Sequence, residues 1–398
     1  MSYLWDLSHI QPQTEVVLSG DTIPAMFWNA VQKRGPTVWM RQKEFGIWRS
    51  WTWNQTAEAV REIAHGLMAL GFAPHETASV LSNTTVEWVL ADLAVLSAGG
   101  VSNGIYPTDA AEQVQFLCED SGTTVLFVED DEQLDKALEV RQHLPRLKKI
   151  VVFDMEGLHE LDDPQVIGLD ALRELGRAHA QTHAGEMEAR VAACRPQDLA
   201  ILVYTSGTTG KPKGAMHSHQ GLVYTVHGYN TLIARDEHDE CMCFLPLCHI
   251  AERMGGEYFS LYTGAKLNFV ENPETVPENV REIAPTVFTA VPRVWEKFYS
   301  GVMITLKEAS RLQQAAYAWA IGVGQRVADR VMAGQPVPGS LRLQFQLARL
   351  LVLDNVRKLI GIHRARFLVT GAAPISPDLV RWYLALGVPM LEVWGMTE

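Results

Sequence analysis

The chain has 398 residues, 47% of them hydrophobic, so it can bury a large core, and its length suggests two or three folding units. Its formal net charge of -12 argues against general nucleic-acid binding, because a protein that neutralises nucleic-acid phosphates is normally basic. The five cysteines, an odd number at irregular spacing, fit a reducing compartment better than a disulfide framework.

Neither the N-terminus of the chain nor its longest apolar segment predicts secretion or membrane insertion. The N-terminal sequence MSYLWDLSHI carries Asp6 and lacks the basic start and apolar run of a signal peptide. The longest apolar candidate, residues 86–105, contains Glu87, Asp92 and two consecutive glycines, so we expect a core helix and turn there. The sequence therefore predicts a soluble, cytoplasmic protein.

The first half of the chain alternates between short apolar runs and segments with helical periodicity. A helix is predicted over 56–70, ending at Gly71 as a helix C-cap. There follow, in chain order, a strand over 78–81, a helix over 85–97, a strand or turn over 100–105, a strand over 125–128, a charged helix over 132–144 and a strand over 150–153. This alternation predicts an α/β fold with parallel strands. Residues 154–196 are polar and are expected to form peripheral helix and loop.

The segment 204–214, YTSGTTGKPKG, combines glycines, small hydroxyl residues and two lysines after an apolar strand over 199–204. Such a loop presents backbone N–H groups with no side chains in the way, and lysines add positive charge. It therefore predicts a polyphosphate cradle. The residues assigned to it are Thr205, Ser206, Gly207, Thr208, Thr209, Gly210 and Lys211.

Two other interpretations of this loop are disfavoured. A Walker P-loop needs four residues between its glycines and a Ser or Thr after its lysine, whereas only two residues separate Gly207 from Gly210 and Pro212 follows Lys211. A flexible Ser/Thr/Gly linker does not usually lie between a buried strand and a basic Lys-Pro-Lys turn.

The second half of the chain begins with further predicted strands, over 241–245, 266–270, 287–290 and 366–369, and contains a long helix-prone segment over 301–366. That segment carries ten basic and three acidic side chains within an acidic protein. One interpretation is a peripheral face for anionic membrane. The other, which we favour from the sequence, is a solvated helical surface whose arginines are paired elsewhere.

With its glycine-rich loop, the chain resembles the adenylate-forming superfamily of acyl-CoA synthetases, luciferases and adenylation domains. Three further segments resemble that superfamily's motifs in the expected order: 245–253 (LPLCHIAER), 370–376 (TGAAPIS) and 393–398 (VWGMTE). A fourth, 291–297 (VPRVWEK), is similar to the long-chain fatty acyl-CoA synthetase branch. The resemblance spans nearly the whole chain.

The resemblance implies a partial N-terminal AMP-binding domain over 1–398, made of two packed α/β subdomains. Their approximate bounds are 75–235, with the phosphate loop, and 15–70 plus 240–398, with a helical insertion near 301–366. It also implies that the chain lacks the family's small C-terminal domain, whose lysine assists adenylation, together with the ribose-binding acid and the hinge. We therefore expect a fragment of a larger synthetase, with little or no thioester formation of its own.

The chemistry implied by the resemblance is attack of a fatty acid carboxylate on the α-phosphorus of ATP, giving acyl-AMP and pyrophosphate, followed by transfer to coenzyme A. Two anions must approach each other, so their charges must be neutralised and their geometry fixed. The resemblance gives Thr205 and Glu398 as partners of Mg²⁺ and Thr397 as a donor to the α-phosphate, with Lys211 also catalytic. Taken alone, Thr397 and Glu398 would more simply be a helix N-cap and first-turn acid.

The resemblance implies that two further segments bind the adenine side of the nucleotide. These are Gly371, Ala372, Ala373 and Pro374, and then Glu392, Val393, Trp394, Gly395 and Met396. Trp394 takes the position where relatives stack a tyrosine on adenine, and Val393 stands where many relatives have glycine. Read in isolation, Trp394 is a core aromatic and the first segment a turn.

Several histidines and cysteines have competing interpretations. The resemblance places His249 near the acyl carboxylate, and a hydrogen-bonded structural histidine is the equal alternative. A zinc site at Cys241, Cys243, Cys248 and His249 is disfavoured by the spacing. His217 and His219 are expected to cap the turn into the helix that follows.

Three functions remain open from the sequence. The first is an ATP-dependent long-chain fatty acid:CoA ligase using ATP, Mg²⁺ and coenzyme A. The second transfers the acyl-adenylate to a carrier protein, and the third is a non-catalytic module that binds a nucleotide or a fatty acid.

Overall fold

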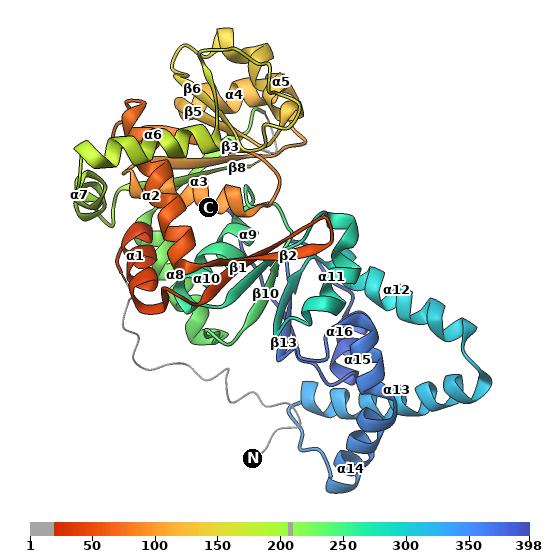
Figure 1. Cartoon of the computed structure of the whole chain (residues 1–398). Coiled ribbons are helices and arrows are strands. Elements are labelled where there is room, and N and C mark those ends of the chain that lie inside the picture. The colour runs from red at the N-terminus through yellow and green to blue at the C-terminus, as the bar shows by residue number, and fades with distance from the viewer. Residues whose placement is uncertain (1–19, 206–209) are drawn as a thin grey trace. The chain divides into compact units, whose positions relative to one another are not determined.

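The computed structural model describes residues 20–205 and 210–398, and these divide into two compact units. The larger unit contains the described residues up to 232 together with 243–269 and 397–398. The smaller unit contains residues 233–242 and 270–396. Each unit contains strands and helices, labelled in Figure 1, so the predicted α/β class is confirmed.

The larger unit contains a seven-stranded sheet in the order β7-β6-β5-β3-β4-β8-β9. All neighbouring pairs are parallel except β8 and β9, which form an antiparallel pair. The strands are β3 (Thr77–Leu81), β4 (Val101–Ile105), β5 (Thr123–Val128), β6 (Lys149–Val152), β7 (Val166–Gly168), β8 (Leu199–Thr205) and β9 (Lys213–Ser218). The strands expected over 78–81, 125–128, 150–153 and 199–204 are therefore present, whereas β7 and β9 were not predicted.

Helices of the larger unit begin at side-chain caps that the sequence supplies. Thr52 and Gln55 form a capping box at the start of α2, and Thr85 caps α3, because their oxygens accept N–H groups that lack helical partners. Residues 154–196, expected to be helix and loop, contain β7, α6 and α7. The helices are α1 (Ile23–Arg34), α2 (Trp53–Ala69), α3 (Val86–Ser97), α4 (Ala111–Ser121), α5 (Asp131–Val140), α6 (Leu169–Thr182), α7 (Glu186–Ala193), α8 (His219–Leu232), α9 (Ile250–Glu252) and α10 (Phe259–Thr263).

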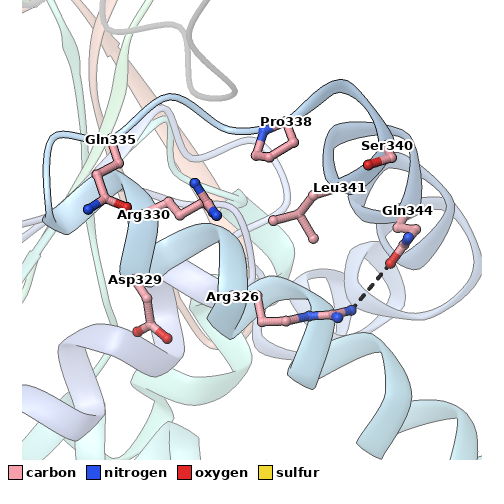
Figure 2. A pocket seen from close by; sticks show the side chains of 8 residues that line it. All are labelled: Arg326, Asp329, Arg330, Gln335, Pro338, Ser340, Leu341 and Gln344. Carbon is pink, nitrogen blue, oxygen red and sulfur yellow. Dashed lines mark hydrogen bonds between the residues drawn. The ribbon is translucent and has the colours of Figure 1, made fainter.

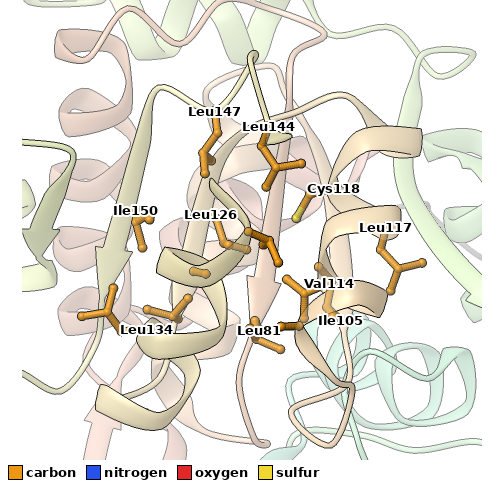
Figure 3. Close-up of a cluster of buried hydrophobic side chains, with 14 of the residues drawn as sticks. Leu81, Ile105, Val114, Leu117, Cys118, Leu126, Leu134, Leu144, Leu147 and Ile150 are labelled. Carbon is orange, nitrogen blue, oxygen red and sulfur yellow. The ribbon is translucent and has the colours of Figure 1, made fainter. Parts of the chain in front are cut away.

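One face of the seven-stranded sheet packs against α4 and α5 in a hydrophobic cluster (Figure 3). Parallel strands are apolar along their length because helices cover both of their faces. Each fully buried leucine of this kind stabilises the fold by about 1.5–3 kcal/mol. Residues of the cluster include Leu81, Leu126 and Ile150 from the strands and Val114, Leu117 and Leu134 from the helices.

A second sheet in the larger unit contains β1 (Val38–Glu44), β2 (Ile47–Thr52) and β11 (Lys266–Phe269). β1 and β2 form a hairpin whose two turn residues, Phe45 and Gly46, have φ values of 48° and 77°. Positive φ at both positions gives the turn the twist that two antiparallel strands need. β1 also pairs in parallel with β11, which lies more than 220 residues later in the chain. β10 (Glu240–Cys243) crosses the division between the two units.

The smaller unit contains a three-stranded parallel sheet in the order β12-β13-β14. Its strands are β12 (Val287–Ala290), β13 (Phe367–Thr370) and β14 (Met390–Glu392). Its helices are α11 (Val276–Ile283), α12 (Pro292–Glu308), α13 (Arg311–Met332), α14 (Gly339–Ala348), α15 (Asp354–Ile360) and α16 (Pro377–Ala385). Trp295 of the VPRVWEK segment is buried in this unit, where its indole N–H donates to the Ala290 carbonyl at 3.1 Å.

The division into units groups residues 20–70 with the seven-stranded sheet, because α2 packs against α6 and α3. The subdomains expected from the resemblance, 75–235 and 15–70 plus 240–398, assign those residues differently, and that assignment stays a prediction. None of the helices within residues 20–205 and 210–398 has the length and apolar character needed to cross a membrane.

Candidate functional site

The predicted phosphate loop connects two strands at the edge of the seven-stranded sheet. The register pairs Leu202 with Met216, Tyr204 with Gly214 and Thr205 with Lys213, so the loop begins where this ladder ends. Thr205 is half-buried at the carboxyl end of β8, and Gly210 and Lys211 are exposed. Ser206, Gly207, Thr208 and Thr209 lie outside the described residues.

Side chains of α4 fix the two ends of this loop. The Tyr204 hydroxyl donates to Asp120 at 2.7 Å, and burial together with that carboxylate raises the pKa of Tyr204, so it stays a donor. A Cβ on Gly214 would lie 3.1 Å from the Tyr204 ring, so the glycine lets the ring lie across β9. The Lys211 ammonium lies 4.9 Å from the centre of the Phe116 ring, a cation–π contact that a bound phosphate would have to outcompete.

His217 on β9 lies close to the chain's last two residues, which belong to the same unit. Burial lowers the pKa of His217, and the Arg253 cation lowers it further. The backbone of Thr397 and the carboxylate of Glu398 act in the opposite direction. Thr397 and Glu398 are therefore close to the strand that leaves the phosphate loop. Thr205 and Glu398 offer a hydroxyl and an exposed carboxylate, which are the oxygen ligands that Mg²⁺ takes.

The expected role of His217 and His219 as caps of the following helix is wrong for His219. Its Nδ1 accepts the backbone N–H of Ile23 at 3.3 Å, so it caps α1 from a distant part of the chain. The oxygen that satisfies the start of α8 belongs to Ser218, which accepts from Gly221 at 3.2 Å. A hydroxyl was the stronger N-cap candidate in the sequence, because serine is a preferred cap.

A buried charge network, not predicted from the sequence, contains the arginine of the LPLCHIAER segment. Arg253 is 0% exposed and forms an ion pair with Asp92, also 0% exposed. Its guanidinium donates to Ser102 at 2.7 Å and to Tyr258 at 3.1 Å, and the Tyr258 hydroxyl donates to Asp92 at 2.8 Å. The guanidinium carbon also lies 4.8 Å from the centre of the Trp88 ring. Each buried charge therefore has an opposite charge and hydrogen bonds, as burial requires.

Glu257 adds a second acid to this network. It is fully buried, and burial together with the nearby Asp92 carboxylate raises its pKa well above the usual range. Burial therefore favours the protonated, neutral form of Glu257. The signal in the sequence was Arg253 itself, since an arginine within an apolar segment needs an acidic partner.

His249 begins a short helix in the same segment. Its Nδ1 accepts the backbone N–H of Ala251 at 3.1 Å, and burial lowers its pKa, so the ring is neutral at pH 7. With Nδ1 acting as the acceptor, the ring proton resides on Nε2, which is then a hydrogen-bond donor. The structural role considered for His249 is thus present, and it leaves Nε2 free to donate to a substrate oxygen.

In the smaller unit, the two predicted adenine segments follow adjacent parallel strands. Residues 371–374 come after β13 and residues 393–396 come after β14, so both lie at the carboxyl edge of the sheet. A Cβ on Gly371 would lie 2.8 Å from Val393 Cγ2 and 3.0 Å from the Val393 carbonyl oxygen. Ala372 has φ 66°, which turns the chain away from the strand. This contact between the two segments was not predicted, and the approach of residues 371–374 to a flat base stays a prediction.

Trp394 is 86% exposed, so the alternative that it is a core aromatic is wrong. Glu392, Gly395 and Met396 are exposed as well. An exposed indole at the carboxyl edge of a parallel sheet can stack on a flat base, and this edge is where α/β folds bind ligands.

Comparison with protein families places these segments in context. The family model described as "AMP-binding enzyme" matches residues 26–398. The long-chain-fatty-acid--CoA ligase ACSBG2 of Xenopus laevis is 31% identical over 386 residues, which are 95% of this chain and 51% of that protein. The rat ACSBG2 is 30% identical over 95% of this chain and 56% of its own length. The chain thus spans about half the length of the curated relatives it matches.

Solved structures share the fold. The anthranilate CoA ligase AuaEII in complex with anthranoyl-AMP has a TM-score of 0.68 and 18% identity over 96% of this chain and 61% of that one. A long-chain-fatty-acid-CoA ligase (FadD1) from Archaeoglobus fulgidus has a TM-score of 0.67 and 17% identity, over 98% of this chain and 66% of that one. At this identity the likeness concerns the fold alone.

Proposed function

The chain belongs to the AMP-binding enzyme family, and from this premise we propose that the whole protein activates a long-chain fatty acid with ATP and transfers it to coenzyme A. The observation that carries the proposal is the segment 204–214, which joins β8 to β9 in a chain that matches this family over 26–398. The curated relatives named long-chain-fatty-acid--CoA ligases support the substrate class and the acceptor.

In the proposed first step, a carboxylate oxygen of the fatty acid attacks the α-phosphorus of ATP, and the bond to the β-phosphate oxygen breaks. Pyrophosphate leaves with that electron pair, and the products are acyl-AMP and pyrophosphate. In the second step the sulfur of coenzyme A attacks the acyl carbonyl, the thiol proton is lost, and AMP leaves. A carboxylate needs this activation because its oxide is a poor leaving group.

The phosphate loop would bind the β- and γ-phosphates through backbone N–H groups, hydroxyls and Lys211. Moving Lys211 from the Phe116 ring to a phosphate would exchange a cation–π contact for a charge-assisted hydrogen bond, which is stronger. Mg²⁺, when bound, neutralises phosphate charge, and Thr205 and Glu398 would hold it through oxygen. Thr397 would donate its hydroxyl to the α-phosphate.

The carboxyl edge of β13 and β14 would bind the nucleoside. Gly371, Ala372, Ala373 and Pro374 would let the backbone approach the base, and the exposed Trp394 would stack on it. His249 would orient the fatty acid, because its neutral ring carries a proton on Nε2 that a carboxylate can accept. This role needs no positive charge on the imidazole.

We also propose that the whole protein is cytoplasmic and touches anionic membrane through the helices of residues 301–366. Arg326 and Arg330 line a cavity of about 530 Å³ between α13 and α14 (Figure 2), and they hydrogen-bond to neutral acceptors, the Gln344 amide and the Pro336 carbonyl. Asp329 beside them is neutralised by Arg381. Exposed apolar side chains on these helices fit a lipid surface. They are Ile304, Leu312, Trp319, Met332, Leu343, Leu347, Leu350, Leu351 and Leu359.

Two assays test these proposals. We expect the whole protein to release pyrophosphate fastest with long-chain fatty acids, and to form acyl-CoA when coenzyme A is supplied. Formation of product only with a phosphopantetheinyl carrier would overturn the acceptor. In vesicle co-sedimentation we expect binding to anionic but not to neutral vesicles, and equal binding to both would overturn the electrostatic membrane contact.

A further inference from the structure

Three side chains with metal-binding atoms meet at the junction of α6 and α7, within the polar segment 154–196. His179 lies in the last turn of α6, His183 follows the end of that helix, and Glu186 begins α7. One ligand atom from each residue lies within 4.8 Å of the other two. Within residues 20–205 and 210–398, no other group of three histidine, cysteine or acidic side chains has ligand atoms this close together.

One of the two possible tautomers of His179 leaves its Nε2 able to bind a metal. Its Nδ1 lies 3.2 Å from Nδ1 of His65, a buried residue of α2, so one of the two nitrogens carries the shared proton. If His179 is the donor, its Nε2 has a free lone pair, and this Nε2 lies 3.8 Å from the Glu186 carboxylate. Metal-binding histidines usually donate their other N–H to such a neighbour.

His183 is arranged in the same way. The Thr182 hydroxyl donates to the His179 carbonyl at 3.1 Å, so the Thr182 oxygen can accept a proton from His183 Nδ1, which lies 2.8 Å away. The carbonyl of His179 is a second acceptor for that nitrogen, at 3.3 Å. Nε2 of His183 then carries the lone pair. The two imidazole rings lie parallel with centroids 4.0 Å apart.

The Glu186 carboxylate offers one oxygen to this pair and uses the other elsewhere. Arg190, one turn along α7, donates to Oε1 at 2.9 Å, while Oε2 faces His179. The arginine fixes the direction of the carboxylate, which is a common arrangement around metal-binding acids.

We propose that His179, His183 and Glu186 bind one Zn²⁺ ion, with water completing its coordination. Two imidazoles and one carboxylate are a ligand set that Zn²⁺ takes, with metal–ligand distances of about 2.0–2.2 Å. The present spread of the ligand atoms is wider than this, so the exposed His183 ring must rotate toward His179 on binding. Such a rotation is a change of side-chain rotamer at an exposed position.

The bound ion would act as a cross-link between two helices. α6 and α7 are joined only by residues 183–185, and Gly185 has φ 83°, a conformation that glycine adopts without strain. α6 packs against α2, as Figure 1 shows, and α7 packs against α3. A metal between them would hold the two helices at a fixed angle, so its binding free energy would stabilise the folded larger unit.

The test is zinc binding by the chain after removal of metal with a chelator. We expect one Zn²⁺ per chain by equilibrium dialysis, and a rise in melting temperature when Zn²⁺ is added. His183→Ala removes an exposed ligand without disturbing the core, and we expect it to weaken binding by more than about 100-fold and to abolish the rise in melting temperature. Thr182→Val removes only the orienting hydroxyl, so we expect a loss of about tenfold.

The matched control is His159→Ala, which removes an exposed histidine elsewhere in the larger unit. We expect this variant to bind Zn²⁺ as the parent chain does. The proposal is overturned if the parent chain shows no saturable Zn²⁺ binding, if His183→Ala binds as tightly as the parent, or if His159→Ala weakens binding equally. In the last case the ion would be bound by scattered surface histidines.

Discussion

Two strand edges, one in each unit, carry candidate residues, and they depend on different physical features. In the larger unit, the Arg253 cation acts on His217 of β9 and belongs to a buried ion pair with Asp92, both residues being 0% exposed. The edge of β13 and β14 in the smaller unit depends on a close backbone approach at Gly371 beneath an exposed Trp394. Substitutions that remove a charge should therefore affect the first edge, and substitutions that change side-chain volume should affect the second. Each kind of substitution should hardly affect the other edge.

The largest effect is expected from Arg253→Met. It leaves Asp92 as an uncompensated buried charge, which costs about 3–5 kcal/mol of the free energy of unfolding. Urea unfolding followed by circular dichroism measures the loss. The control is Arg381→Met, which breaks an ion pair whose partners are 37% and 49% exposed, and it should cost at most about 1 kcal/mol. Equal losses in the two variants would show that burial of the Arg253 pair does not matter.

A pH titration is expected to give the next largest effect, through His219. Burial lowers its pKa to about 4 from the ordinary 6.5. As the pH falls from 6.5 to 4, the unfolded chain binds a proton that the folded chain does not. The free energy of unfolding therefore decreases over this window, by about 3 kcal/mol from this group.

The substitution that isolates the His219 contribution is His219→Asn, whose side-chain oxygen can still accept the Ile23 N–H. We expect its stability to vary less between pH 6.5 and 4 than that of the parent chain. His238→Asn, at an exposed position, should keep the parent's pH dependence. If both variants follow the parent curve, His219 does not contribute to the acid sensitivity of the larger unit.

At the edge of β13 and β14, Gly371→Ala should act by adding side-chain volume. The added Cβ would lie 2.8 Å from Val393 Cγ2, and overpacking of this kind costs about 1–3 kcal/mol. We expect a lower melting temperature and weaker binding of ATP by the whole protein. A second substitution, Val393→Ala, should restore part of both, because it removes the Cγ2 atom.

Gly301→Ala, on α12, is the matched control for this prediction, since a Cβ at Gly301 would meet no described atom within 4 Å. We expect it to bind ATP as the parent protein does, without a lower melting temperature. If Gly301→Ala and Gly371→Ala weaken ATP binding equally, the close approach of the two segments is not what the nucleotide requires.

The smallest effect is expected at the phosphate loop itself. Lys211→Met keeps an apolar stem against Phe116 but removes the charge, so stability should change little while ATP binding weakens by about tenfold, or about 1.5 kcal/mol. Isothermal titration with ATP measures it. Lys307→Met, on α12, is the control. Unchanged ATP affinity in Lys211→Met would remove this lysine from the cradle.

The parts of the fold that the sequence predicted are the apolar ones. β3, β5, β6 and β8 are mostly apolar because both faces of the sheet are covered, and such segments are recognisable without knowing the partner. The β1–β2 hairpin was missed because its residues are mostly polar or half-exposed and its turn, Phe45-Gly46, carries a weak turn signal. The sequence did not predict β9, because its residues form a strand only through their antiparallel pairing with β8.

The candidate site was predictable where a short segment carries the information. Gly371 and Trp394 were assigned from their own segments, and the structure adds that one is sterically constrained and the other is exposed. The pairing of Arg253 with Asp92 could not be predicted, because the two residues are 161 positions apart and only the tertiary fold brings them together. The same holds for His65 beside His179, 114 positions apart.

We propose that the whole protein forms an acyl-adenylate from ATP and a long-chain fatty acid. This proposal is tested most directly by exchange of labelled pyrophosphate into ATP, catalysed by the whole protein without any acyl acceptor. We expect exchange that depends on a long-chain fatty acid and that falls about tenfold in Lys211→Met. Binding of ATP with no fatty-acid-dependent exchange would contradict it, and would leave the protein as a module that binds a nucleotide without activating a carboxylate.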